Sequence, residues 1–214
     1  MTDARRTIVR RGFDRIKNLS DGIVAIAVTL LILPLVDVAT GIGKTDVGVL
    51  LRENSGTFIA FALSFVVIAR LWVQHHGLFR ELEGYTRSLV WANMLWLAAI
   101  IFLPFPTELV SLGPSGDPRV AGLYVGTIAV ASIANVVMHW QIKRSPGMLF
   151  ADARGSIRII PSLVDTIATV VATLLALLVP HASLWPLLLL IPSGYVGSWL
   201  AARREGPTST RRSR

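Results

Sequence analysis

Polar and ionisable side chains stand at the start of the first long apolar segment. Ser20 and Asp21 precede Gly22, and the apolar residues that follow are interrupted by a single hydroxyl, Thr29. Polar groups inside a membrane segment tend to mark the path of an ion or a substrate. A membrane helix that begins on an acid and carries one polar residue in mid-span is therefore unlike a plain anchor. We interpret it as a helix that lines a pore.

Three large aliphatic side chains of this segment fall on one helical face. At about 100° per residue, Ile26, Leu30 and Leu33 form a narrow stripe. Asp37 extends the stripe at its far end, and Thr29 lies to one side of it. Spacing by itself leaves two interpretations open: the stripe faces lipid, or it forms the wall of a pore.

A second group of polar and aromatic side chains lies where the first three apolar segments approach the same membrane surface. Ionisable groups inside a helix bundle are costly unless they are paired, so we expect these residues to form a structural network that holds the first helix to the second. Its expected members are Arg15, Ser20, Asp21, Trp72, His75, His76 and Asn93.

Two chemical roles compete with this structural one. Adjacent histidines on a helix point about 100° apart, which disfavours His75 and His76 as ligands of one metal ion, and we expect no metal site. A proton relay through Asp21 and the two histidines stays open, because histidine titrates near physiological pH. Arg70 and Asp165 lie inside other apolar segments; for Asp165 we expect pairing with Arg158 or His139.

The chain carries none of the common catalytic patterns. It contains no cysteine, no Gly-x-Ser-x-Gly, no His-Glu-x-x-His and no phosphate-binding loop, and its four histidines are scattered. We expect neither an enzyme nor a bound cofactor.

Composition indicates the class of protein that must position these residues. The 214 residues are 53% hydrophobic and only 16% charged, whereas soluble domains are about a quarter charged. A membrane-crossing helix needs about twenty apolar residues. We therefore predict an all-α integral membrane protein with six transmembrane helices, at 17–38, 54–76, 86–111, 119–141, 157–179 and 182–202. Residues 17–202 form the membrane domain, residues 1–16 a basic N-terminus, and residues 203–214 a basic, disordered tail.

The distribution of lysine and arginine predicts the orientation. The N-terminus, the second-to-third and fourth-to-fifth connections and the tail together carry seventeen, against three in the remaining connections. Basic residues favour the cytoplasmic side, so both termini are expected there. The net charge of +8 fits contact with anionic lipid at that face better than nucleic-acid binding.

Three blocks of the sequence resemble the transmembrane-protein-175 family, the lysosomal potassium channels and their bacterial relatives. The blocks follow the family's order and spacing over the first three predicted spans, about half of the chain. They are Arg15-x-x-x-Leu19-Ser20-Asp21, then Ser64-Phe65 with Trp72-x-x-His75-His76-x-x-Phe79, then Asn93 with Phe102-Leu103-Pro104-Phe105-Pro106-Thr107. One departure is Leu19, which stands where the family pattern has phenylalanine.

The resemblance implies a passive, potassium-favouring channel. It implies a homotetramer in a bacterial plasma membrane, with four first helices around a four-fold axis. Rings of Ile26, Leu30 and Leu33 would form a hydrophobic constriction, and Thr29 would lie near its narrow part as the selectivity residue. Asp37 is a weaker candidate for the outer mouth. The alternative function is a proton-permeable pore or a proton-coupled transporter that uses Asp21, His75 and His76.

Overall fold

The fold is known from a computed structural model that describes residues 3–40, 46–112, 117–151 and 153, with residues 163, 164, 166–171 and 174. Of residues 3–12 it describes the backbone alone. The tail, Asp165, most of the predicted fifth span and all of the sixth lie outside the described residues.

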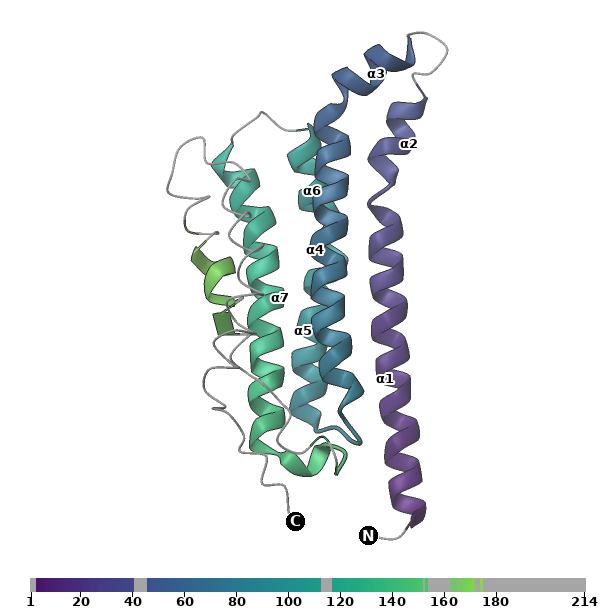
Figure 1. The fold of residues 1–214 in the computed structure, drawn as a ribbon, viewed down its shortest axis with the longest axis vertical. Coiled ribbons are helices and arrows are strands. Elements are labelled where there is room, and N and C mark those ends of the chain that lie inside the picture. Colours follow the sequence, from purple (N-terminus) through teal and green to yellow (C-terminus); the bar gives the residue numbers. More distant parts are fainter. Residues whose placement is uncertain are drawn as a thin grey trace, which may run out of the picture.

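Every regular element in the described ranges is a helix (Figure 1). Four long helical stretches are apolar enough to cross a membrane, at Phe13–Ala39, Ser55–Arg80, Arg87–Leu112 and Pro118–Arg144. They coincide with the first four predicted spans, each longer than predicted at one or both ends. The helices are α1 (Asp3–Leu30), α2 (Leu33–Ala39), α3 (Val47–Glu53), α4 (Ser55–Arg80), α5 (Arg87–Phe102), α6 (Pro104–Leu112) and α7 (Pro118–Arg144).

Side-chain caps at the helix starts explain several of these boundaries. The Asp46 carboxylate accepts from the backbone N–H of Gly48 at 2.8 Å, and the Thr86 hydroxyl accepts from Leu89 at 3.3 Å. The Asp117 carboxylate accepts from the N–H of Arg119 at 2.8 Å, and Pro118 occupies the first helical position. Each cap satisfies an N–H group that the first turn of a helix leaves without a partner.

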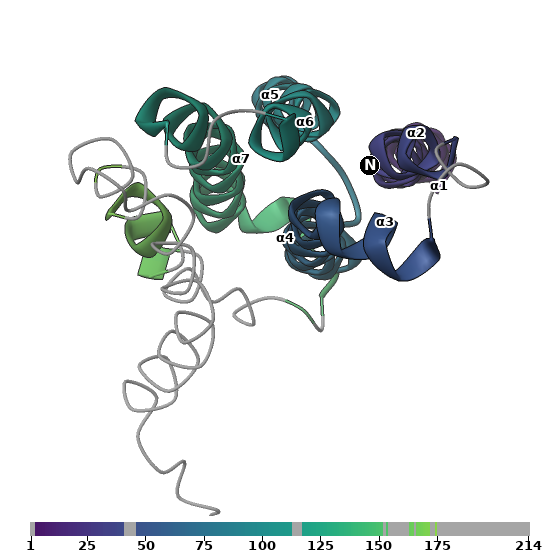
Figure 2. The ribbon, with the colours of Figure 1, turned by 90° about the horizontal axis from the view of Figure 1, so that it is seen from above.

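Two of the four spans are broken by proline. The first span changes from α1 to α2 at Leu31 and Ile32, just before Pro34, and the third changes from α5 to α6 at Leu103, just before Pro104. Proline has no N–H to donate and its ring collides with the preceding turn. In both spans the second segment continues along the first (Figures 1 and 2).

The apolar core lies among α4, α5 and α7, while α1 stands at the edge of the bundle (Figure 2). Ile68, Trp96, Ile100, Val125 and Met138 are fully buried there. The most apolar stretch of the first span has 17% of its residues buried, against 61% for α7. The first span therefore leaves most of its apolar surface uncovered by its own chain.

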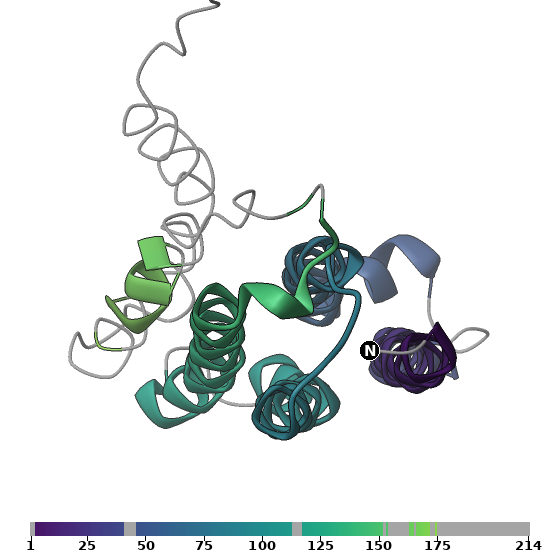
Figure 3. The same cartoon turned by 90° about the horizontal axis from the view of Figure 1, so that it is seen from below.

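The turn between α4 and α5 is tied to the segment that follows α7, at the end of the bundle where α1 starts (Figure 3). Leu82 pairs with Leu149 as a single antiparallel bridge. Glu83 donates its N–H to the carbonyl of Met148 at 2.8 Å, and Phe150 donates to Glu81 at 3.2 Å. The bridge fixes the end of α4, and with it His75 and His76.

Candidate functional site

The residues of the predicted stripe lie on the uncovered face of the first span. Ile26, Leu30 and Leu33 are 60%, 40% and 54% exposed in the single chain, and Leu19 continues the same face. Val24, Ala27 and Leu31, on the opposite face, are buried. Because the two faces alternate with helical period, α1 packs on its own bundle with one side and offers the stripe to lipid, to another subunit or to a pore.

Thr29 lies beside the stripe and is exposed, as its position in the helix predicts. Its hydroxyl donates to the backbone carbonyl of Ile26 at 2.8 Å. A hydroxyl has one hydrogen and two lone pairs, so this bond uses the hydrogen and leaves the oxygen able to face a cation. Asp37 is exposed near the end of α2. It makes no ion pair with any residue that the structure describes.

Ser20, His75 and Asn93 form a fully buried chain of hydrogen bonds, here called the Asn93 cluster. Asn93 accepts from the Nε2 of His75 at 2.7 Å and donates its amide N–H to Ser20 at 3.0 Å. Ser20 in turn donates to the carbonyl of Ile16 at 2.9 Å. This assignment gives His75 its proton on Nε2. These hydrogen bonds join α1, α4 and α5.

The histidine ring of this cluster is also enclosed by aromatic rings. Trp96 and Phe79 stack on His75 with both ring centroids 4.0 Å away. Trp96 belongs to the third span and sequence reasoning did not select it. Trp96 and His75 are far apart along the chain, so their contact could not be predicted from the sequence. The one available signal is the Asn93-x-x-Trp96 spacing, which places Asn93 and Trp96 on the same face of the helix. Because both faces of its ring are covered and its Nε2 is hydrogen-bonded, the His75 side chain is held in one orientation.

Asp21, Trp72 and His76 form a second, half-buried group, here called the Asp21 cluster. Trp72 donates its indole N–H to Asp21 at 2.8 Å, which links α1 to α4. The Nδ1 of His76 lies 3.9 Å from the same carboxylate, and both side chains are 37% exposed. The rings of Trp72 and His76 lie 5.0 Å apart. Trp72 therefore makes the direct bond to Asp21, and His76 lies beside it.

Arg15 was predicted to belong to the polar network, but in the structure it contacts neither the Asn93 cluster nor the Asp21 cluster through a hydrogen bond or ion pair. Its side chain is exposed on α1, and within the described part of the chain it makes no ion pair or hydrogen bond. Asp21 instead satisfies one oxygen with Trp72. Arg15 lies on the uncovered face of α1, where a neighbouring subunit or lipid headgroups can meet it.

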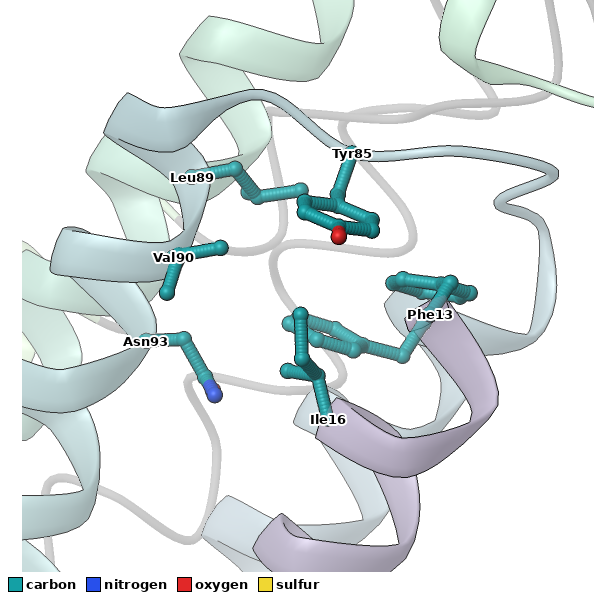
Figure 4. Close-up of a pocket in the computed structure, with 7 residues that line it drawn as sticks. Phe13, Ile16, Tyr85, Leu89, Val90 and Asn93 are labelled. Carbon is teal, nitrogen blue, oxygen red and sulfur yellow. The ribbon is translucent and has the colours of Figure 1, made fainter. Parts of the chain in front are cut away.

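A tightly packed apolar crevice lies next to the Asn93 cluster, along the N-terminal half of α1 (Figure 4). Phe13 stacks on Phe79 with centroids 5.6 Å apart and on Tyr85 at 6.2 Å. Ile16, Leu89 and Val90 complete its walls, and Asn93 supplies the one polar side chain of this lining apart from the Tyr85 hydroxyl. These rings hold the N-terminal half of α1 against the end of α4 and the α4–α5 turn.

A third polar group, here called the hydroxyl joint, links α4, α6 and α7. The Ser64 hydroxyl lies 2.9 Å from the hydroxyl of Thr107 and 2.9 Å from that of Tyr124. All three side chains are buried. Ser64 and Thr107 belong to the motif blocks, but nothing in their spacing indicates that they meet, because they come from separate spans.

Residues 15–104 match the family described as the endosomal/lysosomal potassium channel TMEM175. The chain is 32% identical over 139 residues to a potassium channel of Streptomyces collinus, which covers 64% of this chain and 66% of that one. It is 36% identical over 127 residues to a potassium channel of Chamaesiphon minutus, covering 56% and 62%.

A vertebrate relative matches more narrowly. The endosomal/lysosomal proton channel TMEM175 of Gallus gallus is 37% identical over 105 residues, which is 46% of this chain and 21% of the relative. The matched segment thus spans about two thirds of the bacterial relatives and about a fifth of the vertebrate one.

The helices and the site together define a multi-pass, all-helical integral membrane protein with an uncovered apolar stripe on its first span. The chain belongs to the TMEM175 family, on the match over residues 15–104 and the likeness to its bacterial relatives. The family consists of ion channels, and the chain is therefore not an enzyme.

Proposed function

We propose that this protein is a passive, potassium-favouring cation channel of a bacterial plasma membrane, assembled as a homotetramer with both termini in the cytoplasm. The first span of each subunit lines the pore. The observation that carries the proposal is the alternation of exposure along α1, which leaves Ile26, Leu30 and Leu33 on a face that its own chain does not cover.

The proposed constriction works by dewetting. Rings of Ile26, Leu30 and Leu33 around a four-fold axis form a narrow apolar neck in which water and ions are held poorly, so the closed pore needs no plug. Four Thr29 hydroxyls beside the neck offer oxygen atoms to a cation that has lost part of its hydration. The Asn93 and Asp21 clusters hold the inner end of α1, so the outer part of the helix is the part that moves.

Potassium as the permeant ion is supported by the names of the bacterial relatives, which are potassium channels. Asp37 lies at the outer end of the same face and would concentrate cations at the mouth. The basic residues of the N-terminus, the connections and the tail would face anionic lipid on the cytoplasmic side.

A proton-permeable pore is the second candidate, because the vertebrate relatives are named proton channels. The half-exposed Asp21 and His76 lie 3.9 Å apart and could exchange protons. His75 does not extend that pair to the stripe, since its Nε2 is bonded to Asn93 and its ring is covered on both faces. The geometry therefore favours the cation channel.

The test is ion flux through the purified full chain in liposomes, first with a potassium gradient, then sodium, then a pH gradient. We expect potassium flux above sodium flux, a smaller preference in Thr29→Val, and a several-fold rise in flux in Leu30→Asn, because a polar ring holds water in the neck. Val66→Asn is the control, since Val66 is an equally apolar, exposed residue of α4.

Equal flux in Leu30→Asn and wild type would show that the stripe is not the constriction. Proton flux without potassium or sodium flux would favour the second candidate.

A further inference from the structure

The C-terminal end of α7 holds an arginine against a tryptophan ring. The guanidinium of Arg144 lies 3.8 Å from the centroid of the Trp140 ring, and both side chains are exposed. Residues four apart are neighbours on a helix surface, and a side chain leans toward the N-terminus of its own helix. Arg144 therefore reaches back along α7, and the ring holds its guanidinium there through a cation–π contact.

The end of the helix fixes the position of this pair. α7 ends at Arg144 because Ser145 precedes Pro146, and the residue before a proline is disfavoured in a helical backbone. The same end of the bundle contains the start of α1 (Figure 1). Tryptophan in membrane proteins is enriched at the level of the lipid headgroups. The guanidinium of Arg144 thus lies where the fourth span leaves the hydrocarbon core.

The positive charge at this end of α7 is not neutralised by the protein. Lys143 and Arg144 are both exposed, and neither forms an ion pair with any residue that the structure describes. Glu81, on the turn that is bridged to the segment after α7, pairs with Arg80 at 3.3 Å. A basic residue near the last carbonyls stabilises a helix C-terminus, and Lys143 can fill that role. Arg144 instead carries its charge back over Trp140.

An apolar stripe on α7 runs from this pair into the membrane. Its exposed residues share one helical face and are here called the α7 stripe: Val130, Ile133, Val137 and Trp140. Arg144 continues the same face. The stripe is about 15 Å long, which is half of the ~30 Å hydrocarbon core and therefore the thickness of one leaflet. One acyl chain can lie along it with its headgroup at Arg144.

We propose that the α7 stripe and the basic end of α7 form a binding site for one acidic phospholipid. Arg144 and Lys143 bind the headgroup phosphate, and an acyl chain packs on the stripe. A guanidinium suits this ligand because its planar N–H groups bind two phosphate oxygens at once. A choline headgroup would bring a second positive charge to the same two residues, which disfavours it.

The site is separate from the proposed pore. α7 lies on the other side of α4 and α5 from α1 (Figure 2). The inference rests on one part of the proposed function, the contact of the basic residues with anionic lipid, and not on ion conduction.

Lipid binding by the purified full chain tests the site. Native mass spectrometry would follow titration with phosphatidylglycerol and, separately, with phosphatidylcholine of the same acyl chains. We expect the wild type to bind phosphatidylglycerol more tightly and Arg144→Gln to weaken that binding about fivefold. Arg144→Lys keeps the charge but loses the paired N–H groups, so it should fall between the two. Trp140→Leu keeps both charges and should weaken binding about two- to threefold, because the guanidinium loses its platform.

Arg87 and Trp91 provide the matched controls. They are also an arginine and a tryptophan four residues apart, both exposed, at the same end of the bundle. Here the arginine comes first, so it leans away from the ring. Arg87→Gln and Trp91→Leu should therefore change phosphatidylglycerol binding less than Arg144→Gln and Trp140→Leu do.

The outcomes separate this site from the wider proposal. Equal binding of the two lipids by the wild type overturns both the site and the proposed contact with anionic lipid. A preference for phosphatidylglycerol that falls equally in Arg87→Gln and Arg144→Gln overturns the site alone. Displacement of phosphatidylglycerol by an equal concentration of inorganic phosphate would also overturn it, in favour of a free phosphate ion. Ion flux is measured separately, so a failure of the channel function is distinct from each of these results.

Discussion

Asn93 holds the N-terminal half of α1 against α4 and α5. Its amide is fully buried and uses both of its polar ends, one on His75 of α4 and one on Ser20 of α1. An asparagine side chain can bridge the two helices in this way because its amide carries both a hydrogen-bond acceptor and a donor.

Replacing Asn93 by alanine should therefore destabilise the protein. His75 and Ser20 each lose a buried partner, and a buried polar group left unsatisfied costs about 1–3 kcal/mol. We expect the free energy of unfolding in detergent to fall by that order. Asn18→Ala is the control, because Asn18 is exposed on α1. A loss in Asn93→Ala no larger than in Asn18→Ala would contradict the structural role.

Residue types and spacing predicted much of this site. Ser20, Asp21, Trp72, His75, His76 and Asn93 all lie at one end of the first three spans, as expected. Which of them pair was beyond sequence reasoning: Asp21 meets Trp72, 51 residues away, and Ser20 meets Asn93, 73 residues away. Periodicity gives the face of one helix, while pairing depends on the rotation and height of two helices relative to each other.

At the scale of helices, the spans differ in where side-chain hydrogen bonds join them to their neighbours. The hydroxyl joint of Ser64, Thr107 and Tyr124 fastens α4, α6 and α7 to one another, and Ser111 adds a bond to Thr57 at 2.9 Å. The first span is joined to α4 and α5 by side-chain hydrogen bonds at Ser20 and Asp21, in the N-terminal half of the span. Beyond these two residues it packs through apolar contacts, which suits the movement proposed for this helix.

Ser64→Ala should loosen the three helices of the joint. Both Thr107 and Tyr124 lose a 2.9 Å contact, although Thr107 keeps its bond to the Leu103 carbonyl. Interhelical hydrogen bonds in membranes contribute about 0.6–2 kcal/mol each, so unfolding should become easier by about 1–2 kcal/mol. Thermal unfolding of Ser64→Ala against Ser55→Ala, an exposed serine of the same helix, measures it. Equal stabilities would show that the joint contributes nothing.

Helix positions were well predicted and helix breaks were not. The first four spans agree with the hydrophobic runs, because a run of about twenty apolar residues has no other low-energy state in a bilayer. The effect of Pro34 could not be predicted from the sequence. Proline in a membrane helix can bend the helix, break it or leave it nearly straight, depending on whether neighbouring groups satisfy the freed backbone groups. The predicted fifth and sixth spans, with Asp165, lie outside the described residues.

At the scale of the molecule, the chain leaves a large apolar surface on one side. Leu19, Ile26, Leu30, Leu33 and Val36 are all at least 40% exposed along the first span. Next to them lie Gly22 and Ala25, also exposed. Small residues let membrane helices approach closely. The stripe itself is proposed to face the pore, and the flank beside it that carries Gly22 and Ala25 is where the proposed tetramer would bring one subunit against the next.

Gly22→Leu should prevent this assembly without harming the protomer. A Cβ at Gly22 meets no atom within 4 Å of its own chain, so a larger side chain fits the single subunit and collides only with a neighbour. We expect native mass spectrometry in detergent to show tetramers of the wild type and smaller species of Gly22→Leu.

Gly77→Leu is the matched control, since Gly77 of α4 is exposed and equally unobstructed. A Gly22→Leu protein that stays tetrameric would place the subunit interface on another face.

The sequence by itself determined that this protein is an all-helical membrane protein, where its first four spans lie, and which faces carry the polar clusters and the apolar stripe. Those properties follow from local periodicity and from the thickness of the bilayer. Tertiary structure decided which polar side chains meet and that Arg15 stays apart from Asp21. It also decided that the first span is interrupted between α1 and α2, at Leu31 and Ile32. These depend on how separate helices rotate and pack against one another, and no single segment contains that information.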